Sequence, residues 1–307
     1  MKKLLLLHIL CFIIINNINA FADLPKFGFN SSRPWTNRLQ TNGISSLKNT
    51  QLDGSLDNML PVLGSDTTNL FLDGGYDAAT GFNSITSIGA GGRFLRNWTS
   101  SKQVIFGTYA FALYQDTPTS NVWYINPGVE LFTNYQLLRF QLYFPITAKL
   151  ISYGYFEEME TKHRREYIVP GEHLDEYGNG IEFLFDQTFN YLYGGDFVID
   201  LYHFSFPISP DINGAAFIFE LDFPDNKFTT DGSFFLQQNY DNQQNYSIMI
   251  GLSFTFGGPD DRPEVLSSRM EEPIDRFLAR RQYALVGPNY TNLITTGSPV
   301  LIPPTPG

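Results

Sequence analysis

Two groups of residues have side chains of the types that catalysis or metal binding requires. His203 and Ser205 are two residues apart in a strand-like segment, so they share a face, and the imidazole could accept the serine proton before attack on an ester carbonyl. These two residue types at this spacing are commonplace, and Pro207 and Pro210 follow them closely. No Asn or Asp is visibly placed to orient the ring. We therefore favour a loop-facing histidine without a catalytic role.

The second group consists of His163 and His173, which lie among acidic residues. Their spacing of ten residues matches no compact zinc motif, so solvated loop charges are the favoured interpretation. The single cysteine, Cys11, lies in the N-terminal apolar segment, and the glycines of 89–92 open no helix that could bind phosphate. The sequence therefore predicts no enzyme, no metal site and no cofactor.

The composition indicates a folded, aromatic-rich protein. The 307 residues are 43% hydrophobic, 16% aromatic and only 17% charged, which argues against a disordered chain or a coiled coil. The 31 acidic residues against 20 lysines and arginines give a net charge of −11. A surface of that sign repels a phosphate backbone, so we expect no nucleic-acid partner.

The first 22 residues have the pattern of an export signal. Lys2 and Lys3 precede the apolar run of residues 4–15, and Ala20 and Ala22 occupy the −3 and −1 positions of a cleavage site. The apolar run has twelve residues, whereas a membrane-spanning helix needs about 20. We predict a signal peptide over residues 1–22, followed by a polar periplasmic lead segment over residues 23–58.

From Asn69 to Phe256 apolar and polar side chains alternate, which predicts β-strands, and we place the predicted barrel domain at residues 59–257. In the final strand of this array, the even-numbered residues from Tyr246 to Phe256 are apolar or aromatic, whereas the odd-numbered residues are mostly small or polar. Such alternation suits either a soluble β-sandwich or a membrane β-barrel with a polar lumen. In a barrel, four acids would face the lumen: Asp196, Asp200, Glu220 and Asp222.

Three further features favour the barrel. Aromatic residues gather at the strand ends, small residues crowd the strand at 89–92, and the export signal supplies the compartment. Connections also alternate between tight turns such as Thr133 to Gln136 and a long charged loop from Tyr155 to Gly180. We predict an all-β fold, an antiparallel transmembrane barrel of about 12 strands in the bacterial outer membrane. Two of the twelve would come from an extended hairpin within residues 149–169.

The last strand carries a pattern that resembles the signal read by the outer-membrane barrel-assembly machinery. Gly251, Phe254 and Phe256 supply its glycine and alternating aromatic positions, whereas Ile250 stands where a polar residue is usual. The alternative is an ordinary amphipathic strand. Expected partners are thus outer-membrane lipid and that machinery.

Residues 258–307 differ in character from the strands. Pro263 can open a helix that continues to Tyr283 with a restart at Pro273, and charged residues surround it on all sides. We predict a plug helix in the polar lumen, in which Arg269, Arg276 and Arg280 face the luminal acids. A solvated periplasmic helix is the alternative.

An ordered set of fragments resembles the translocator barrel of inverse autotransporters, the intimin and invasin family. The fragments are 59–64, 70–76, 89–94, 107–116, 128–131, 195–199 and the post-barrel segment of 269–276 with Arg269, Met270, Pro273, Ile274 and Arg276. The resemblance implies a twelve-stranded outer-membrane barrel whose C-terminal linker threads the lumen and carries an adhesive passenger outward. A host-cell surface or a separate passenger would then be a further partner.

The sequence departs from that family after the barrel. Only 24 residues follow Tyr283, and they contain no immunoglobulin-like repeats and no lectin-like cap, so we expect no adhesin within the chain. The open alternatives are a vestigial or separately encoded passenger, an outer-membrane pore, or an adhesin that binds through its loops. The His203-x-Ser205 pair also resembles the dyad of outer-membrane phospholipase A, which is the least favoured alternative.

Overall fold

The computed structural model describes most of the region expected to form strands. It covers residues 38–46, 52–65, 67–79, 84–99, 102–117, 119–162, 165–189, 195–223, 231–242, 245–256, 294–295 and 300–301. The predicted signal peptide and the predicted plug helix therefore lie outside the described residues. Within the described residues, no helix has the length and hydropathy that a membrane-spanning helix requires.

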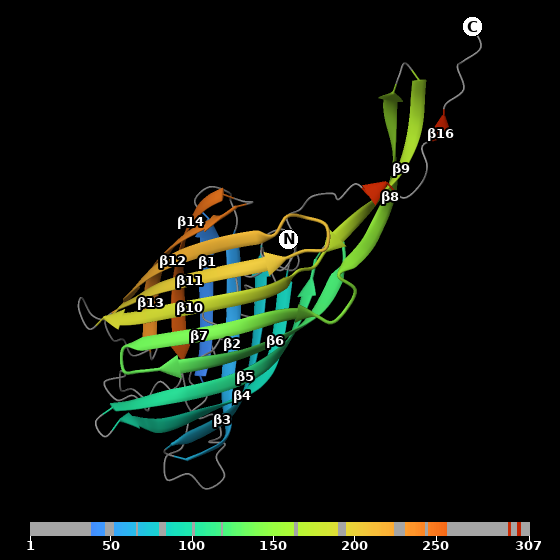
Figure 1. The fold of residues 1–307 in the computed structure, drawn as a ribbon. Helices are drawn as coiled ribbons and strands as arrows, with labels where there is room; N and C mark the ends of the chain where they lie inside the picture. The colour runs from blue at the N-terminus through green and yellow to red at the C-terminus, as the bar shows by residue number, and fades with distance from the viewer. Residues whose placement is uncertain are drawn as a thin grey trace, which may run out of the picture.

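Twelve antiparallel strands form a closed barrel, which confirms the predicted fold class (Figure 1). The first and last strands close it, with Leu39 opposite Phe256 and Ser46 opposite Met249. Closure pairs the backbone of every strand on both sides, so no sheet edge is left exposed to lipid. The strands are β1 (Arg38–Ser46), β2 (Leu52–Ser65), β3 (Thr68–Ala79), β4 (Ser84–Thr99), β5 (Lys102–Asp116), β6 (Asn121–Phe132), β7 (Gln136–Pro145), β10 (Asn179–Phe189), β11 (Gly195–Ser205), β12 (Ile212–Asp222), β13 (Asp231–Asp241) and β14 (Asn245–Phe256).

The barrel begins earlier in the chain than the sequence indicated. Residues 38–46 and 52–58, predicted as part of the periplasmic lead, form β1 and the first half of β2. The apolar alternation of β1 is weak, but β1 is paired along its length with β2 on one side and β14 on the other. Ladder hydrogen bonds and neighbouring strands can therefore hold a segment whose own pattern is poor.

The predicted hairpin exists, but it lies outside the barrel wall. Strands β8 (Leu150–Lys162) and β9 (Arg165–Glu176) pair with each other, while β7 pairs directly with β10 and closes the wall behind them. Figure 1 shows this hairpin projecting away from the barrel. The expected strand number was right, but β1 and β2 supply the two strands assigned to the hairpin. The long charged loop is in fact mostly β-structure.

The antiparallel order places the chain segments at two distinct ends of the barrel. We call one the terminal end, because β1 starts there and β14 finishes there. The tight turn between β6 and β7, in which the Thr133 N–H donates to the Gln136 carbonyl (2.8 Å), lies at the same end. The opposite, hairpin end carries the connection from β7 to β10, including β8 and β9.

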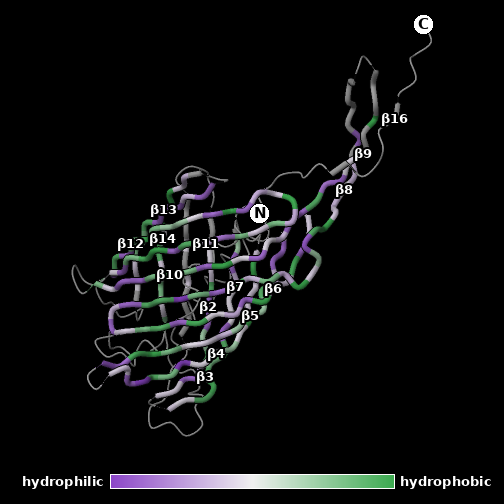
Figure 2. Tube along the Cα trace, viewed as in Figure 1, coloured by the Kyte–Doolittle hydropathy of each residue, from purple (hydrophilic) through white to green (hydrophobic). Residues whose placement is uncertain are grey.

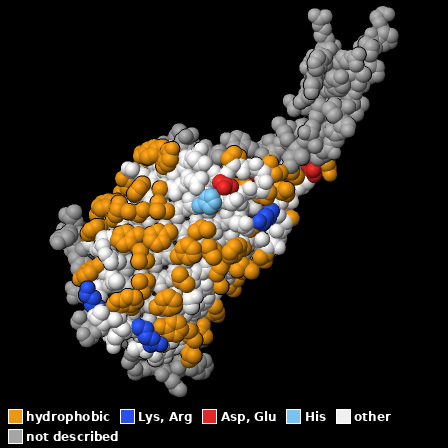
Figure 3. Space-filling model, in the orientation of Figure 1, with side chains coloured by type: hydrophobic (Ala, Val, Ile, Leu, Met, Phe, Trp, Pro, Cys, Tyr) orange, Lys and Arg blue, Asp and Glu red, His pale blue; other side chains and the backbone are white. Residues whose placement is uncertain are grey.

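Alternation along each strand separates a lumen from an outer surface. On β7, Phe140 and Phe144 are 40% and 43% exposed, whereas the intervening Gln141 and the adjacent Arg139 are buried. Hydropathy accordingly alternates along the strands (Figure 2), and apolar side chains cover much of the outer surface in view (Figure 3). Such a surface suits lipid, and the buried polar side suits a lumen.

Candidate functional site

The lumen carries most of the buried charge of the described residues, and that charge is predominantly negative. Two arginines, Arg93 and Arg139, are buried together with eleven acidic residues. The acids are Asp57, Asp73, Asp77, Glu130, Glu176, Glu182, Asp186, Asp196, Asp200, Glu220 and Asp241. A lumen of this composition attracts cationic groups.

Three of the four predicted luminal acids are deeply buried inside the barrel. Asp196, Asp200 and Glu220 are at most 6% exposed. Asp222 lies on the same face of β12, but it is only partly buried because it is the last residue of the strand.

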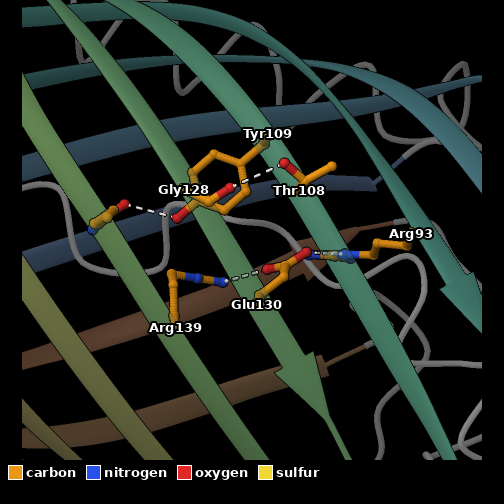
Figure 4. Close-up of polar contacts among 7 residues, drawn as sticks. Arg93, Thr108, Tyr109, Gly128, Glu130 and Arg139 are labelled. Atoms are coloured by element: carbon orange, nitrogen blue, oxygen red, sulfur yellow. Dashed lines mark hydrogen bonds and ion pairs between the residues drawn. The ribbon is translucent and has the colours of Figure 1, made fainter.

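A chain of three charged residues crosses the lumen side of β4 to β7 (Figure 4). Arg93 donates from Nε to Glu130 Oε1 at 2.5 Å and from Nη2 to Glu130 Oε2 at 3.3 Å. Arg139 Nη2 reaches Glu130 Oε2 at 3.5 Å. The Arg93 guanidinium also lies 5.3 and 4.8 Å from the ring centroids of Phe71 and Phe132. One Glu130 carboxylate therefore contacts two guanidinium groups within a buried site.

Gly107 makes this ion network possible. The network spans β4 and β6, which are separated by β5, so the Glu130 side chain must pass across β5. A Cβ at position 107 would collide with the Glu130 carboxylate and its Cγ. Tyr109 crosses the next strand in the same manner over Gly128, and its hydroxyl donates to Gln141 Oε1 at 2.9 Å.

Sequence reasoning missed this network. Its members are far apart in the chain, and only the strand register brings Arg93, Gly107 and Glu130 to one level. One signal was available, because Arg93, Glu130 and Arg139 all occupy the inward phase of their strands. Inward-facing charged residues on nearby strands of one wall can lie side by side when the register aligns them.

The wall formed by β10, β11 and β12 has a different composition. It buries Glu182, Asp186, Asp196, Asp200 and Glu220, and residues 179–222 contain no lysine or arginine. Hydroxyl donors reach two of these acids, since Tyr143 donates to Glu182 at 2.7 Å and Ser233 donates to Glu220. Cationic counter-charges for this wall must therefore come from other parts of the chain or from solution.

The C-terminal tail returns at the hairpin end. Its two short strands, β15 (Ile294–Thr295) and β16 (Val300–Leu301), pair antiparallel with β9. The barrel wall itself ends with Phe256 at the terminal end. Residues 257–293 thus connect two points at opposite ends of the barrel. The predicted plug residues Arg269, Met270, Pro273, Ile274, Arg276 and Arg280 belong to this connection and lie outside the described residues.

The base of the hairpin is fastened to two neighbouring connections. The Asp175 carboxylate accepts hydrogen bonds from Thr119 (2.5 Å) and Ser120, and Glu176 accepts one from the Ser209 N–H at 2.9 Å. Burial raises the pKa of the Tyr177 hydroxyl above its ordinary value, although a hydrogen bond with Ser120 partly lowers it. A neutral tyrosine next to Asp175 avoids a second negative charge at this joint.

The residues of the predicted assembly signal lie at the barrel seam. Gly251 faces inward on β14, and a Cβ there would meet the Phe235 ring and the Gly43 carbonyl of β1. Phe254 and Phe256 are partly buried on the outer side of the strand. Gly251 therefore allows the close approach of β1 and β14 that closes the barrel.

The structure supplies an orienting group for His203 that the sequence did not reveal. Asn213 on β12 lies opposite His203, with its Oδ1 2.8 Å from the ring Nδ1. The other ring nitrogen lies 3.9 Å from Asp211 Oδ2, and the side chains of both His203 and Asp211 are exposed. This arrangement places the ring between Asn213 and Asp211 and shows no contact with Ser205.

Only one of the two histidines weighed as metal ligands, His173, belongs to the described residues. His163 lies outside the described residues, and His173 stacks on Tyr153 with ring centroids 5.5 Å apart. No group of three or more potential metal ligands occurs among the residues that the structure describes.

Comparison with known proteins identifies the fold class. No family model matches the sequence, and no curated protein matches it either. A chain solved in work on the in-meso crystallization of membrane proteins is 16% identical with a TM-score of 0.50, and the match covers 84% of this chain and 98% of that one. The KdgM porin is 9% identical (TM-score 0.41; 72% and 99% covered), and the translocator domain of the autotransporter NalP from Neisseria meningitidis is 7% identical (TM-score 0.29; 80% and 95% covered).

The first of these matches agrees with the fold of the described strands, whose closed wall has an apolar outer surface and a charged lumen. The protein is a bacterial outer-membrane β-barrel.

Proposed function

We propose that this barrel is a non-enzymatic translocator of the inverse-autotransporter type, whose own C-terminal segment crosses the lumen and carries the following tail outward. One observation supports this function above all others. Phe256 ends the wall at the terminal end, and Ile294 pairs with the hairpin at the opposite end. In outer-membrane barrels the short turns face the periplasm and the longer loops face outward. The hairpin end is therefore the outer end.

The lumen is the physically favoured route for residues 257–293. These 37 residues could span well over 100 Å if extended at about 3.3 Å each, far more than a hydrocarbon layer of about 30 Å. A path along the lipid surface would expose unpaired backbone groups and eleven charged side chains to hydrocarbon. The polar lumen carries no such penalty.

Arginines of the same segment offer partners for the luminal acids. Residues 257–293 contain five arginines and six acidic residues, and the barrel strands bury ten acids against two arginines. We expect Arg269, Arg276 and Arg280 to lie near Asp196, Asp200, Glu220 and Asp222, which belong to a wall without basic residues. In this arrangement the fragment with Met270, Pro273 and Ile274 would form the inner part of the plug.

The function can be tested by locating the tail on intact cells. An epitope placed after Gly307 should be accessible to antibody without breaking the outer membrane. Matched controls are the same epitope inserted between Lys162 and Arg165 at the hairpin tip, expected to be accessible, and between Phe189 and Gly195 at the terminal end, expected to be protected. Protection of the Gly307 epitope together with exposure of the hairpin epitope would contradict the proposal.

Bilayer conductance tests whether the same segment fills the lumen. Deletion of residues 262–282 should raise single-channel conductance, because it would remove a plug from the pore. Unchanged conductance would show that the segment lies elsewhere.

An outer-membrane pore is the second candidate, favoured by the acidic lumen. It predicts substantial, cation-selective conductance in the intact chain, because buried acids attract cations and repel anions. A loop-mediated adhesin would instead act through the projecting hairpin, and replacing residues 157–170 by a short turn would abolish cell attachment without affecting tail exposure.

A further inference from the structure

We propose that one edge of β9, the edge not paired with β8, is a docking site for the exported C-terminal tail of the same chain. The tail joins the hairpin there as an antiparallel strand directed away from the barrel. This inference rests on the proposed function, because the tail must first reach the outer end. It adds a specific partner for the hairpin and a role for it: the hairpin retains the exported segment and sets the direction in which that segment leaves the barrel.

Two short ladders define the docking site. Ile294 and Thr295 pair with Glu172 and Gly171, close to the base of the hairpin. Val300 and Leu301 pair with Ile168 and Tyr167, closer to its tip. The tail therefore runs outward along β9, and Figure 1 shows β16 beside the projecting hairpin. Both described parts of the tail therefore pair with the same strand.

The hairpin needs such a partner for a physical reason. One edge of β9 is covered by β8, and the other would be a row of unpaired backbone groups outside the barrel. Strand addition satisfies such an edge through main-chain hydrogen bonds, which tolerate many side chains. The hydrogen bonds at Asp175 and Glu176 fix the base of the hairpin, so a strand docked on β9 inherits a defined direction.

Paired cysteines can test the register directly. Cys11 is the single cysteine of the chain, and it would be replaced by serine in every variant. The in-register pairs are Glu172→Cys with Ile294→Cys, and Ile168→Cys with Val300→Cys. Opposite residues of antiparallel strands have Cα atoms about 4.5–5.5 Å apart, within the range of about 4.4–6.8 Å that a disulfide requires.

The swapped pairs are matched controls that use the same four substitutions. Glu172→Cys with Val300→Cys, and Ile168→Cys with Ile294→Cys, are each four residues out of register, or about 13 Å along a strand. On intact cells, with an oxidant or a short bis-maleimide, the in-register pairs should link at least tenfold faster than the swapped pairs. Equal rates for all four pairs, or no linkage of the in-register pairs, would overturn the proposal. Heat-dependent gel migration would verify that each variant forms the barrel.

A separate label distinguishes failure of docking from failure of export. Thr305→Cys alone should react with a membrane-impermeant maleimide on intact cells if the tail is outside. Labelling without in-register linkage would refute docking on β9 and leave translocation intact. Labelling only after the outer membrane is broken would refute both.

Discussion

Two walls of the same lumen handle buried charge in different ways. On the wall of β4 to β7, Glu130 lies between Arg93 and Arg139, so its charge is balanced by residues of the wall itself. On the wall of β10 to β12, five acids are buried and the strands contribute no lysine or arginine. The first wall pairs its buried acid with arginines of the same wall, whereas cations for the second wall must come from outside it.

The difference suggests that the two walls have different roles in the barrel. In the first wall each buried charge has an opposite charge beside it, so removal of one partner would leave another buried and uncompensated. An acidic wall without basic residues is stable only when a cationic partner or counterions offset the repulsion. In the proposed function the arginine-bearing segment supplies that partner, and five substitutions can test the contrast.

The largest effect is expected from Glu130→Gln. The substitution preserves volume but leaves two buried guanidinium groups without their carboxylate, which should destabilise the barrel by about 3–5 kcal/mol. Urea-induced unfolding in detergent micelles would measure the loss. A change below about 1 kcal/mol would show that the network is not a stabilising element.

The two arginines should differ in the same assay. Arg93 makes the two Glu130 contacts of 2.5 and 3.3 Å, whereas Arg139 makes one of 3.5 Å. Arg93→Met should therefore cost about 1.5–3 kcal/mol, the range for hydrogen bonds to charged groups, and Arg139→Met should cost less. A larger loss of stability for Arg139→Met than for Arg93→Met would contradict the ranking of the two contacts.

Gly107→Ala tests whether the glycine is required for the network. The added methyl group meets Glu130, so the carboxylate must move, and we expect a loss of about 1–3 kcal/mol from overpacking. Gly43→Ala is the control, because a Cβ there meets nothing within 4 Å. Equal effects of the two substitutions would indicate a general glycine effect rather than a specific clash.

The smallest effect should come from the acidic wall. In the intact chain Asp200→Asn should remove a favourable interaction with the plug, whereas in a chain lacking residues 262–282 it should relieve repulsion. The unfolding free energies should then show a coupling of about 1 kcal/mol between the two changes. Strict additivity would mean that Asp200 and the segment do not interact.

Local sequence patterns predicted some elements well and others poorly. The alternation on β7 and β14 predicted which side chains face outward, and it did so because each strand has one apolar face. It missed β1, whose place depends on its two neighbours. It also assigned the hairpin to the wall, because the alternation within β8 and β9 does not reveal that β7 pairs with β10.

The amino-acid sequence was enough to predict the two-sided character of the barrel and its acidic lumen. Both follow from the period of two, which fixes the face of each residue relative to its own strand. The three-dimensional structure was needed to show that Glu130 reaches Arg93 over Gly107, that the hairpin lies outside the wall, and that Phe256 and Ile294 lie at opposite ends. These features depend on strand register and on contacts between distant segments, which no local pattern encodes.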